Sequence, residues 1–378
     1  VRDYLFMYER IIPEILREYD PETFYWPASP SSGGSFDNPN DPNRGDVHYW
    51  EVWHGNKPFA EYRKYFFRYA SEFGFQAFPS VKTLETVTDD PRELNPFSYV
   101  MEKHQRNYGG NGKIAKYMQA AYRYPENFSD FVYASQLLQA DGIRYGVEHY
   151  RRNRGRCMGA IYWQLNDCWP VISWSSVDYY GRWKALHYYA KRFFAPVMLS
   201  CEEQSWMTVE ADMNRQHFEF EKSIRLNVTN ETLTDRRVLV KWAVRKADAT
   251  VLMEEKQWVE VPALSAVWLD KVELPQIDCF NEYVSYEAWE DDQVISQGTV
   301  IFSYPKYFHY LDPKLTVRTE GDEIIVSASA YAKSVEILND TEDLILEDNY
   351  FDMNAGERWI KILQGKPEGL RVRSVYDI

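Results

Sequence analysis

The sequence FFRYASEFGF, residues 66–75, is an apolar and aromatic run that predicts a strand centred on 67–74. Similar aromatic runs predict three more strands, at 23–29, 47–53 and 157–165. Helical patterns accompany them at 3–19, about 93–107, 112–123, 128–153 and 182–194. Strands that alternate with helices predict parallel pairing through right-handed crossovers. Because four such units do not close a barrel of eight, the pattern predicts either an open α/β sheet or half of a barrel.

The pattern changes near Pro196, beyond which short alternating apolar and polar runs replace the helices. These runs predict strands at about 206–211, 222–246 (two strands joined by a polar turn), 251–260, 266–273, 282–289, 294–302, 315–319, 322–329, 333–338, 343–347 and 369–376. We therefore expect three domains: an α/β unit at 1–196, an immunoglobulin-like β-sandwich at 197–303 and a second, smaller sandwich at 304–378.

The composition of the chain bears on its binding partners and on its cellular compartment. The 378 residues carry a net charge of −14 and no strong basic patch, so we expect no nucleic acid as a partner. No run approaches the roughly 18 apolar residues of a membrane span, and the first residues lack the pattern of a secretory signal. The four cysteines lack the spacing of a disulfide scaffold. They favour a soluble protein in a reducing compartment such as the cytoplasm, although they do not decide it.

Two strand ends carry candidate functional groups. Glu72 ends the strand at 67–74, and functional groups of parallel sheets and barrels collect at the carboxyl ends of strands. A carboxylate there suits a fixed nucleophile, although a structural ion pair is the commoner role. In YWQLND, residues 162–167, Trp163 can stack on a sugar ring while Asp167 binds its hydroxyls. A core tryptophan beside a helix-capping aspartate would give the same pattern.

Other predicted strands add weaker candidates. In WEVWHG, residues 50–55, Trp50 and His54 are expected on one side because alternate residues of a strand share a face. His54 can equally be a structural imidazole, and Trp26, on the first strand, can be either a core or a site residue. No metal site is expected, because the seven histidines are not spaced like metal ligands along the chain. They are residues 48, 54, 104, 149, 187, 217 and 309.

Three motifs occur together and in order: HYWEVWHGNKPF at 48–59, SEFGFQAFPS at 71–80 and IYWQLNDCWPVISWSSVDYYGRWKALHYYAKRFFAP at 161–196. Over about residues 20–200 they closely resemble glycoside hydrolase family 2, and in particular its β-mannosidases. That family has a sugar-binding sandwich, an immunoglobulin-like domain, a catalytic (β/α)₈ barrel and further sandwiches. The resemblance implies that residues 1–196 are the second half of the TIM barrel, strands five to eight, followed by the immunoglobulin-like domains.

The resemblance also implies roles for residues. The nucleophile of the family is a glutamate in a Ser-Glu-aromatic-Gly motif at the end of barrel strand seven, which corresponds to Glu72. Trp163 would be the aromatic platform under the sugar in subsite −1, and the same pocket would be lined by Trp50, Trp53, His54 and, as a hydroxyl ligand, Asp167. The acid/base glutamate of the family follows an asparagine, but the Asn-Glu pairs at 230–231 and 281–282 fall in the β region.

The implied activity is a retaining exo-β-mannosidase that hydrolyses terminal non-reducing β-D-mannose residues of an oligosaccharide or glycan without a cofactor. This chain would supply the nucleophile, and its partner, the amino-terminal half of the same enzyme, would supply the acid/base. An exo-β-glucosaminidase, a β-galactosidase or an endo-β-mannosidase stays open as an alternative, although QAFPS and NDCWP favour the mannosidase. A non-catalytic carbohydrate-binding relative is the alternative from another class. The strand-end Glu and Trp groups argue against a purely structural sandwich scaffold.

Overall fold

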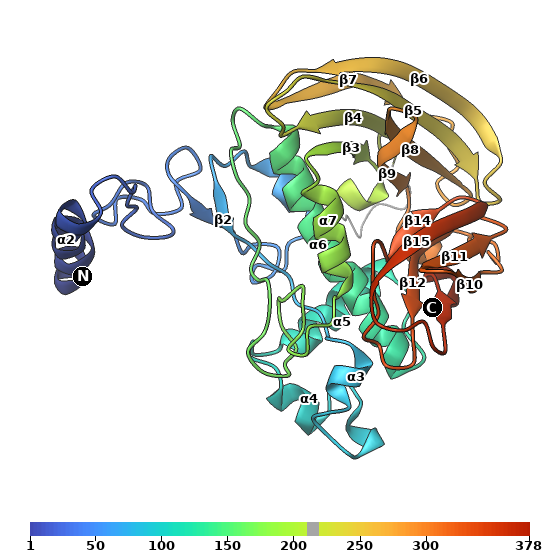
Figure 1. The fold of residues 1–378 in the computed structure, drawn as a ribbon, viewed down its shortest axis with the longest axis horizontal. Coiled ribbons are helices and arrows are strands. Elements are labelled where there is room, and N and C mark those ends of the chain that lie inside the picture. Colours follow the sequence, from blue (N-terminus) through green and yellow to red (C-terminus); the bar gives the residue numbers. More distant parts are fainter. Residues whose placement is uncertain (210–218) are drawn as a thin grey trace.

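The computed structural model describes residues 1–209 and 219–378 (Figure 1). The first part consists mainly of helices and irregular segments with two short strands, whereas the part after residue 196 consists mainly of strands. Figure 1 shows α6 and α7 at the centre, with one β-sandwich above them and the other beside them. The expected immunoglobulin-like sandwiches are thus confirmed, whereas the predicted domain boundaries stay predictions.

A helical segment begins the chain and stands apart from the rest of the molecule (Figure 1). It comprises, without a break, α1 (Arg2–Phe6), the π-turn η1 (Met7–Ile11) and α2 (Ile12–Tyr19), which confirms the helix predicted at 3–19. None of its side chains is buried, and the exposed ones include several large apolar groups, among them Phe6 and Ile15. Removing apolar surface from water is favourable, so the exposed apolar side chains of this helix form a face that another part of a protein could cover.

A short parallel ladder positions Glu72. β1 (Val47–His48) pairs with β2 (Ala70–Glu72) in parallel, with His48 opposite Glu72. On the other side of β2 the segment 158–163 runs in the same direction: the Ile161 N–H donates to Ala70 O at 2.8 Å and the Trp163 N–H to Phe73 O at 2.8 Å. The parallel pairing expected from the alternation of strands and helices is therefore present, in a reduced form.

All four strands predicted before Pro196 are shorter than expected or absent. The strand predicted at 67–74 is reduced to β2, Ala70–Glu72. The strand predicted at 47–53 ends at His48, because the chain then turns and the His54 N–H donates to Trp50 O at 2.7 Å. The segment 157–165 forms only isolated bridges, at Cys157 and Ala160, and 23–29 forms no strand. Pro27 has no N–H to donate to a ladder, which accounts for part of that difference.

The remaining helices cover the ladder and join it to the sandwiches. They are η2 (Phe59–Lys64), α3 (Val81–Leu84), η3 (Pro91–Glu93), α4 (Tyr99–Lys103), α5 (Gly110–Ala121), α6 (Phe128–Arg152) and α7 (Ala185–Phe193). The helix predicted at 128–153 is confirmed, and its first turn is capped by Asn127, whose side chain accepts the Asp130 N–H. The continuous helix predicted at 93–107 is wrong: Pro96 interrupts the segment, and α4 begins only after the capping Ser98.

The first sandwich packs two antiparallel sheets around a core of its own. One sheet has the order β3 (Val197–Gln204), β4 (Ser223–Asn230), β7 (Ser265–Glu273); the other has the order β6 (Val251–Val261), β5 (Arg236–Lys246), β8 (Glu282–Glu290), β9 (Gln293–Ile301). The strand predicted at 206–211 is not found: residues 206–208 form the 3₁₀ turn η4 (Trp206–Thr208), and 210–211 lie outside the described residues. The strand β3 was not predicted.

The second sandwich shares its core with the helices. Its sheets have the orders β10 (Thr316–Glu320), β11 (Glu323–Ala328), β15 (Gly356–Gln364), β13 (Ile345–Leu346) and β14 (Phe351–Met353), β12 (Ala332–Leu338), β16 (Arg371–Arg373), with turns η5 (Pro305–Tyr307) and η6 (Val375–Asp377) beside them. Ile324 and Val335 belong to the same apolar cluster as the α6 residue Leu137. In residues 1–209 and 219–378, every helix is too short or too polar to span a bilayer.

Candidate active site

Glu72 is the last residue of β2, and its side chain is 18% exposed. His48, its register partner on β1, forms an ion pair with it, with 2.5 Å between Nδ1 and Oε2. Within the described residues, no lysine or arginine pairs with Glu72, and the other carboxylate oxygen, Oε1, has no partner. The parallel pairing of β1 with β2 thus holds one oxygen of the carboxylate and leaves the other available.

A buried aspartate two residues before His48 supports this pair. Asp46 Oδ2 accepts hydrogen bonds from Ser29 Oγ at 2.6 Å and Ser71 Oγ at 2.5 Å. Its other oxygen accepts the Trp26 Nε1–H and the Ser31 N–H, both at 2.9 Å. Burial alone would raise the pKa of Asp46, but these hydrogen bonds outweigh it and hold the pKa below its ordinary value. Asp46 is therefore an ionised anchor rather than a proton donor.

Gly74 lets an aromatic cluster approach the ladder beyond Glu72. A Cβ on Gly74 would lie 2.4 Å from the carbonyl oxygen of Trp163, 2.9 Å from Cη2 of Trp50 and 3.0 Å from Cδ1 of Trp174. Only a glycine accommodates these approaches. The structure thus brings Trp50 and Trp163 together around the Ser-Glu-Phe-Gly motif. Trp163 is 46% exposed, which leaves its indole free to stack on a ligand, and the Trp163–Gln164 peptide bond is cis.

Trp53 and His54 lie differently from the strand geometry that was predicted. Trp53 is fully buried and packs edge-on against Phe75 and Trp174, so it supports the cluster and has no surface for a sugar. His54 is exposed, and its ring centroid lies 5.1 Å from that of Trp50. The expected contact between them is present, but a turn creates it. Burial and, to a smaller degree, the charge of Lys113 lower the pKa of His54 below its ordinary value.

The other two predicted site residues are tied by hydrogen bonds to other side chains of the protein. Asp167 is buried, and its two carboxylate oxygens accept hydrogen bonds from Ser173 Oγ at 2.7 Å and Ser175 Oγ at 2.6 Å. Its oxygens thus have partners that a sugar hydroxyl would have to displace. Trp26 is 38% exposed and is tied by its indole N–H to Asp46, so it borders the site through that anchor.

Three residues of the site were not predicted from the sequence: His48, Asp46 and Trp174. His48 and Asp46 alternate with Val47 at the start of the predicted strand at 47–53, and this alternation is the signal that places both on one face. Which residue they meet on β2 depends on strand register, which the sequence does not show. Trp174 lies in the long motif at 161–196 but outside any predicted strand.

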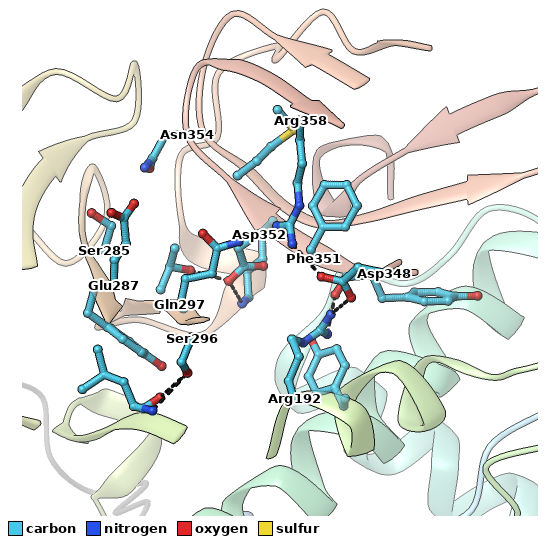
Figure 2. A pocket seen from close by; sticks show the side chains of 18 of the residues that line it. Arg192, Ser285, Glu287, Ser296, Gln297, Asp348, Phe351, Asp352, Asn354 and Arg358 are labelled. Atoms are coloured by element: carbon cyan, nitrogen blue, oxygen red, sulfur yellow. Dashed lines mark hydrogen bonds and ion pairs between the residues drawn. The ribbon is translucent and has the colours of Figure 1, made fainter. Parts of the chain in front are cut away.

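A separate cavity of about 310 Å³ lies where the helices meet both sandwiches (Figure 2). Figure 2 shows Asp348 between Arg192 and Arg358, which both pair with it. Lys333 pairs with Asp352 in the same wall, with 3.3 Å between Nζ and Oδ2. Because each of these charged side chains is paired with another and no residue of β1 or β2 lines the cavity, we regard it as a polar joint between domains.

The site offers a carboxylate with one restrained oxygen beside an exposed indole, a combination suited to nucleophilic attack on a bound sugar. Among residues 1–209 and 219–378, no three or more His, Cys, Asp or Glu side chains come together as a possible metal site.

Comparisons with known proteins relate the chain to mannosidases. Residues 222–307 match the family described as a mannosidase Ig/CBM-like domain, and residues 310–378 match an Ig-fold domain of mannosidases. Beta-mannosidase B of Thermothelomyces thermophilus is 31% identical over 93% of this chain, and that of Aspergillus terreus is 28% identical over 95%. The crystal structure of β-D-mannosidase from Dictyoglomus thermophilum superposes with a TM-score of 0.84 at 26% identity over 98% of the chain.

In all three comparisons the chain spans 44% of the length of the relative. The matches extend through the ladder, the helices and both sandwiches, so they involve the whole of the described architecture. The chain therefore belongs to the β-mannosidases of glycoside hydrolase family 2 and corresponds to their carboxy-terminal portion.

Proposed function

We propose that this chain is the nucleophile-bearing part of a retaining exo-β-mannosidase that hydrolyses terminal non-reducing β-D-mannose residues of a glycan. The observation that carries the proposal is the position of Glu72 at the carboxyl end of β2, with Oε2 held by His48 and Trp163 on the adjoining ladder segment. The relatives named β-mannosidase support mannose as the sugar.

We propose further that residues 1–196 are the second half of a (β/α)₈ barrel, completed by the amino-terminal half of the same enzyme. Two features support this. The ladder segment at 158–163 and the residues just after it expose apolar side chains: Ile161 is 51% exposed and Leu165 58%. The first helix likewise leaves apolar side chains uncovered, among them Phe6 and Ile15. Closing a barrel removes the open edges of a sheet and would bury such groups.

The acid/base is proposed to come from that amino-terminal half. Of the two Asn-Glu pairs in the chain, Asn230-Glu231 lies at the end of β4, where Glu231 pairs with Arg154. Asn281-Glu282 lies at the start of β8, where Glu282 accepts the Asp278 N–H at 3.0 Å. Both glutamates belong to the first sandwich and have structural partners, so neither is assigned as the proton donor.

The proposed reaction has two steps. In the first, a carboxylate oxygen of Glu72 bonds to the anomeric carbon while the bond from that carbon to the leaving oxygen breaks, and the acid/base protonates the leaving oxygen. In the second, the acid/base takes a proton from water, which attacks the same carbon and releases Glu72. Two inversions give net retention, and the two carboxyl groups need to lie about 5–5.5 Å apart. Trp163 would bind the apolar face of the sugar.

The test uses the complete protein that contains this chain and follows release of nitrophenol from 4-nitrophenyl β-D-mannoside. Glu72→Gln keeps the size of the side chain but removes the nucleophile, and it should lower kcat by at least about 10⁴-fold. The control is Glu85→Gln, an exposed glutamate paired with Lys82, which should leave kcat unchanged. An unchanged rate in Glu72→Gln would remove the assignment of the nucleophile.

The same assay separates the alternatives. A faster reaction with the matching glucosaminide or galactoside would favour another family 2 glycosidase, and mannoside binding without hydrolysis would favour a carbohydrate-binding relative. Proton NMR of the first product decides the stereochemistry: a retaining enzyme releases β-mannose, which then equilibrates with the α-anomer.

A further inference from the structure

The imidazole of His48 is oriented by a chain of hydrogen bonds that starts at Asp46. Ser29 Oγ donates to Asp46 Oδ2 at 2.6 Å and also lies 2.9 Å from His48 Nε2. Asp46 is ionised and can only accept, so the single hydroxyl hydrogen of Ser29 lies between Ser29 Oγ and Asp46 Oδ2. Ser29 can then only accept at its contact with His48, so Nε2 of His48 carries a hydrogen and donates it to Ser29.

This assignment determines what the other ring nitrogen can do. Nδ1 lies 2.5 Å from Oε2 of Glu72, a distance at which two bare lone pairs would repel, so a proton lies between them. When Glu72 acts as the nucleophile, its Oε2 therefore accepts this hydrogen bond from Nδ1 of His48. Oε2 is then occupied by the ion pair, whereas Oε1 has no partner within residues 1–209 and 219–378.

We propose that His48 is a positioning residue for the glycosidase reaction: it holds Oε2 of Glu72 so that Oε1 is the oxygen that attacks the anomeric carbon. The inference rests on the proposed function and names the group that fixes its nucleophile. His48 acts through Glu72 and does not touch the sugar. An unrestrained carboxylate rotates about its terminal bond, and a misplacement of about 1 Å at a reacting atom can cost about 10²-fold in rate.

Two nearly isosteric variants separate positioning from packing. His48→Asn places an amide N–H close to the position of Nδ1, facing Glu72, whereas His48→Gln places one close to Nε2, facing Ser29. Positioning predicts that His48→Asn keeps kcat within about fivefold of the unmodified protein, and that His48→Gln lowers it by about 10- to 100-fold with KM changed less than about threefold. A residue needed only for packing would give similar values for the two amides.

The decisive measurement isolates the nucleophile from the acid/base. With 2-deoxy-2-fluoro-β-D-mannosyl fluoride, Oε1 forms an ester bond to the anomeric carbon while the carbon–fluorine bond breaks. Fluoride departs with the bonding electrons and needs no proton donor. Mass spectrometry of the complete protein then gives the rate of labelling at Glu72. Labelling should be about 10- to 100-fold slower in His48→Gln than in His48→Asn.

The outcomes distinguish the two proposals. If the unmodified protein neither hydrolyses an aryl β-mannoside nor becomes labelled, the proposed function is wrong. If it does both, but the Asn and Gln variants label equally fast, only the role of His48 is overturned. Should either variant of His48 fail to fold, Ser29→Ala removes the hydrogen bond to the imidazole without altering the pair itself, and it should slow labelling at least threefold. An unchanged rate in Ser29→Ala would then overturn the inference.

Discussion

Replacing Gly74 by alanine should separate the segment that carries Trp163 from β2. The new Cβ would lie 2.4 Å from the carbonyl oxygen of Trp163 and 2.9 Å from Cη2 of Trp50, whereas atoms in contact prefer about 3.5–4.0 Å. The oxygen belongs to the backbone and cannot rotate away, so the segment itself has to shift by roughly 1 Å. Overpacking of this kind costs about 1–3 kcal/mol of the free energy of unfolding.

Urea unfolding followed by tryptophan fluorescence measures that loss, and the aryl-mannoside assay measures its effect on activity. On the proposed function, a shift of Trp163 by about 1 Å should lower kcat/KM by at least 10-fold. The matched control is Gly112→Ala in α5, where a Cβ meets nothing within 4 Å and alanine favours the helix by about 0.5–1 kcal/mol. Equal stability and activity in the two variants would refute the close approach of Trp163 to Gly74.

Two further predictions concern Trp163 and a buried histidine. Trp163→Ala should lower kcat/KM for an aryl β-mannoside by roughly 10-fold with little loss of stability, whereas Trp359→Ala, equally exposed on the second sandwich, should change neither. Burial, with the nearby charge of Arg152, lowers the pKa of His149 from 6.5 to about 3. Between these values the unfolded chain binds a proton that the native state does not, so the free energy of unfolding falls by up to about 1.4 kcal/mol per pH unit as pH drops. His149→Gln should flatten this slope in urea titrations between pH 7 and pH 4, and equal slopes would contradict the assignment.

The parts of the fold that the sequence predicts well are those specified by local pattern. The helix α6 has a capping asparagine and 25 residues of helical periodicity, and the hairpin of β4 and β5 alternates around a polar turn. The strand β15, GERWIKILQ, alternates too, but the segment around it was not recognised as a strand. The segment at 23–29 has the aromatic composition of a strand but pairs with no neighbour among the described residues, and the segment at 157–165 pairs with β2 only through a few hydrogen bonds.

The same distinction between local pattern and long-range contacts applies to the residues of the candidate site. Glu72 and Trp163 could be identified because each lies in a distinctive motif at a strand end. The ion pair between His48 and Glu72 could not, because it depends on the register between two strands that are 24 positions apart in the chain, from 48 to 72. The burial of Trp53 depends in turn on Phe75 and Trp174, which are brought to it only when the ladder forms.

On the proposed function, the geometry of the nucleophile is set within this chain, whereas the acid/base comes from the amino-terminal half of the enzyme. Ser29, Asp46, His48 and Glu72 all lie within the first 72 residues, and their contacts need the pairing of β1 with β2 and the packing of the segment around Ser29 against it. On the proposed function, the two requirements of the first step are thus separable. Labelling with a mannosyl fluoride depends on the placement of Glu72. Hydrolysis of an alkyl mannoside, whose alkoxide is a poor leaving group, also depends on a proton donor, which contributes about 10²–10⁴-fold to the rate. Replacing the acid/base in the proposed amino-terminal half should therefore abolish the second reaction while the first continues, and loss of both together would show that the half barrel cannot hold its nucleophile alone.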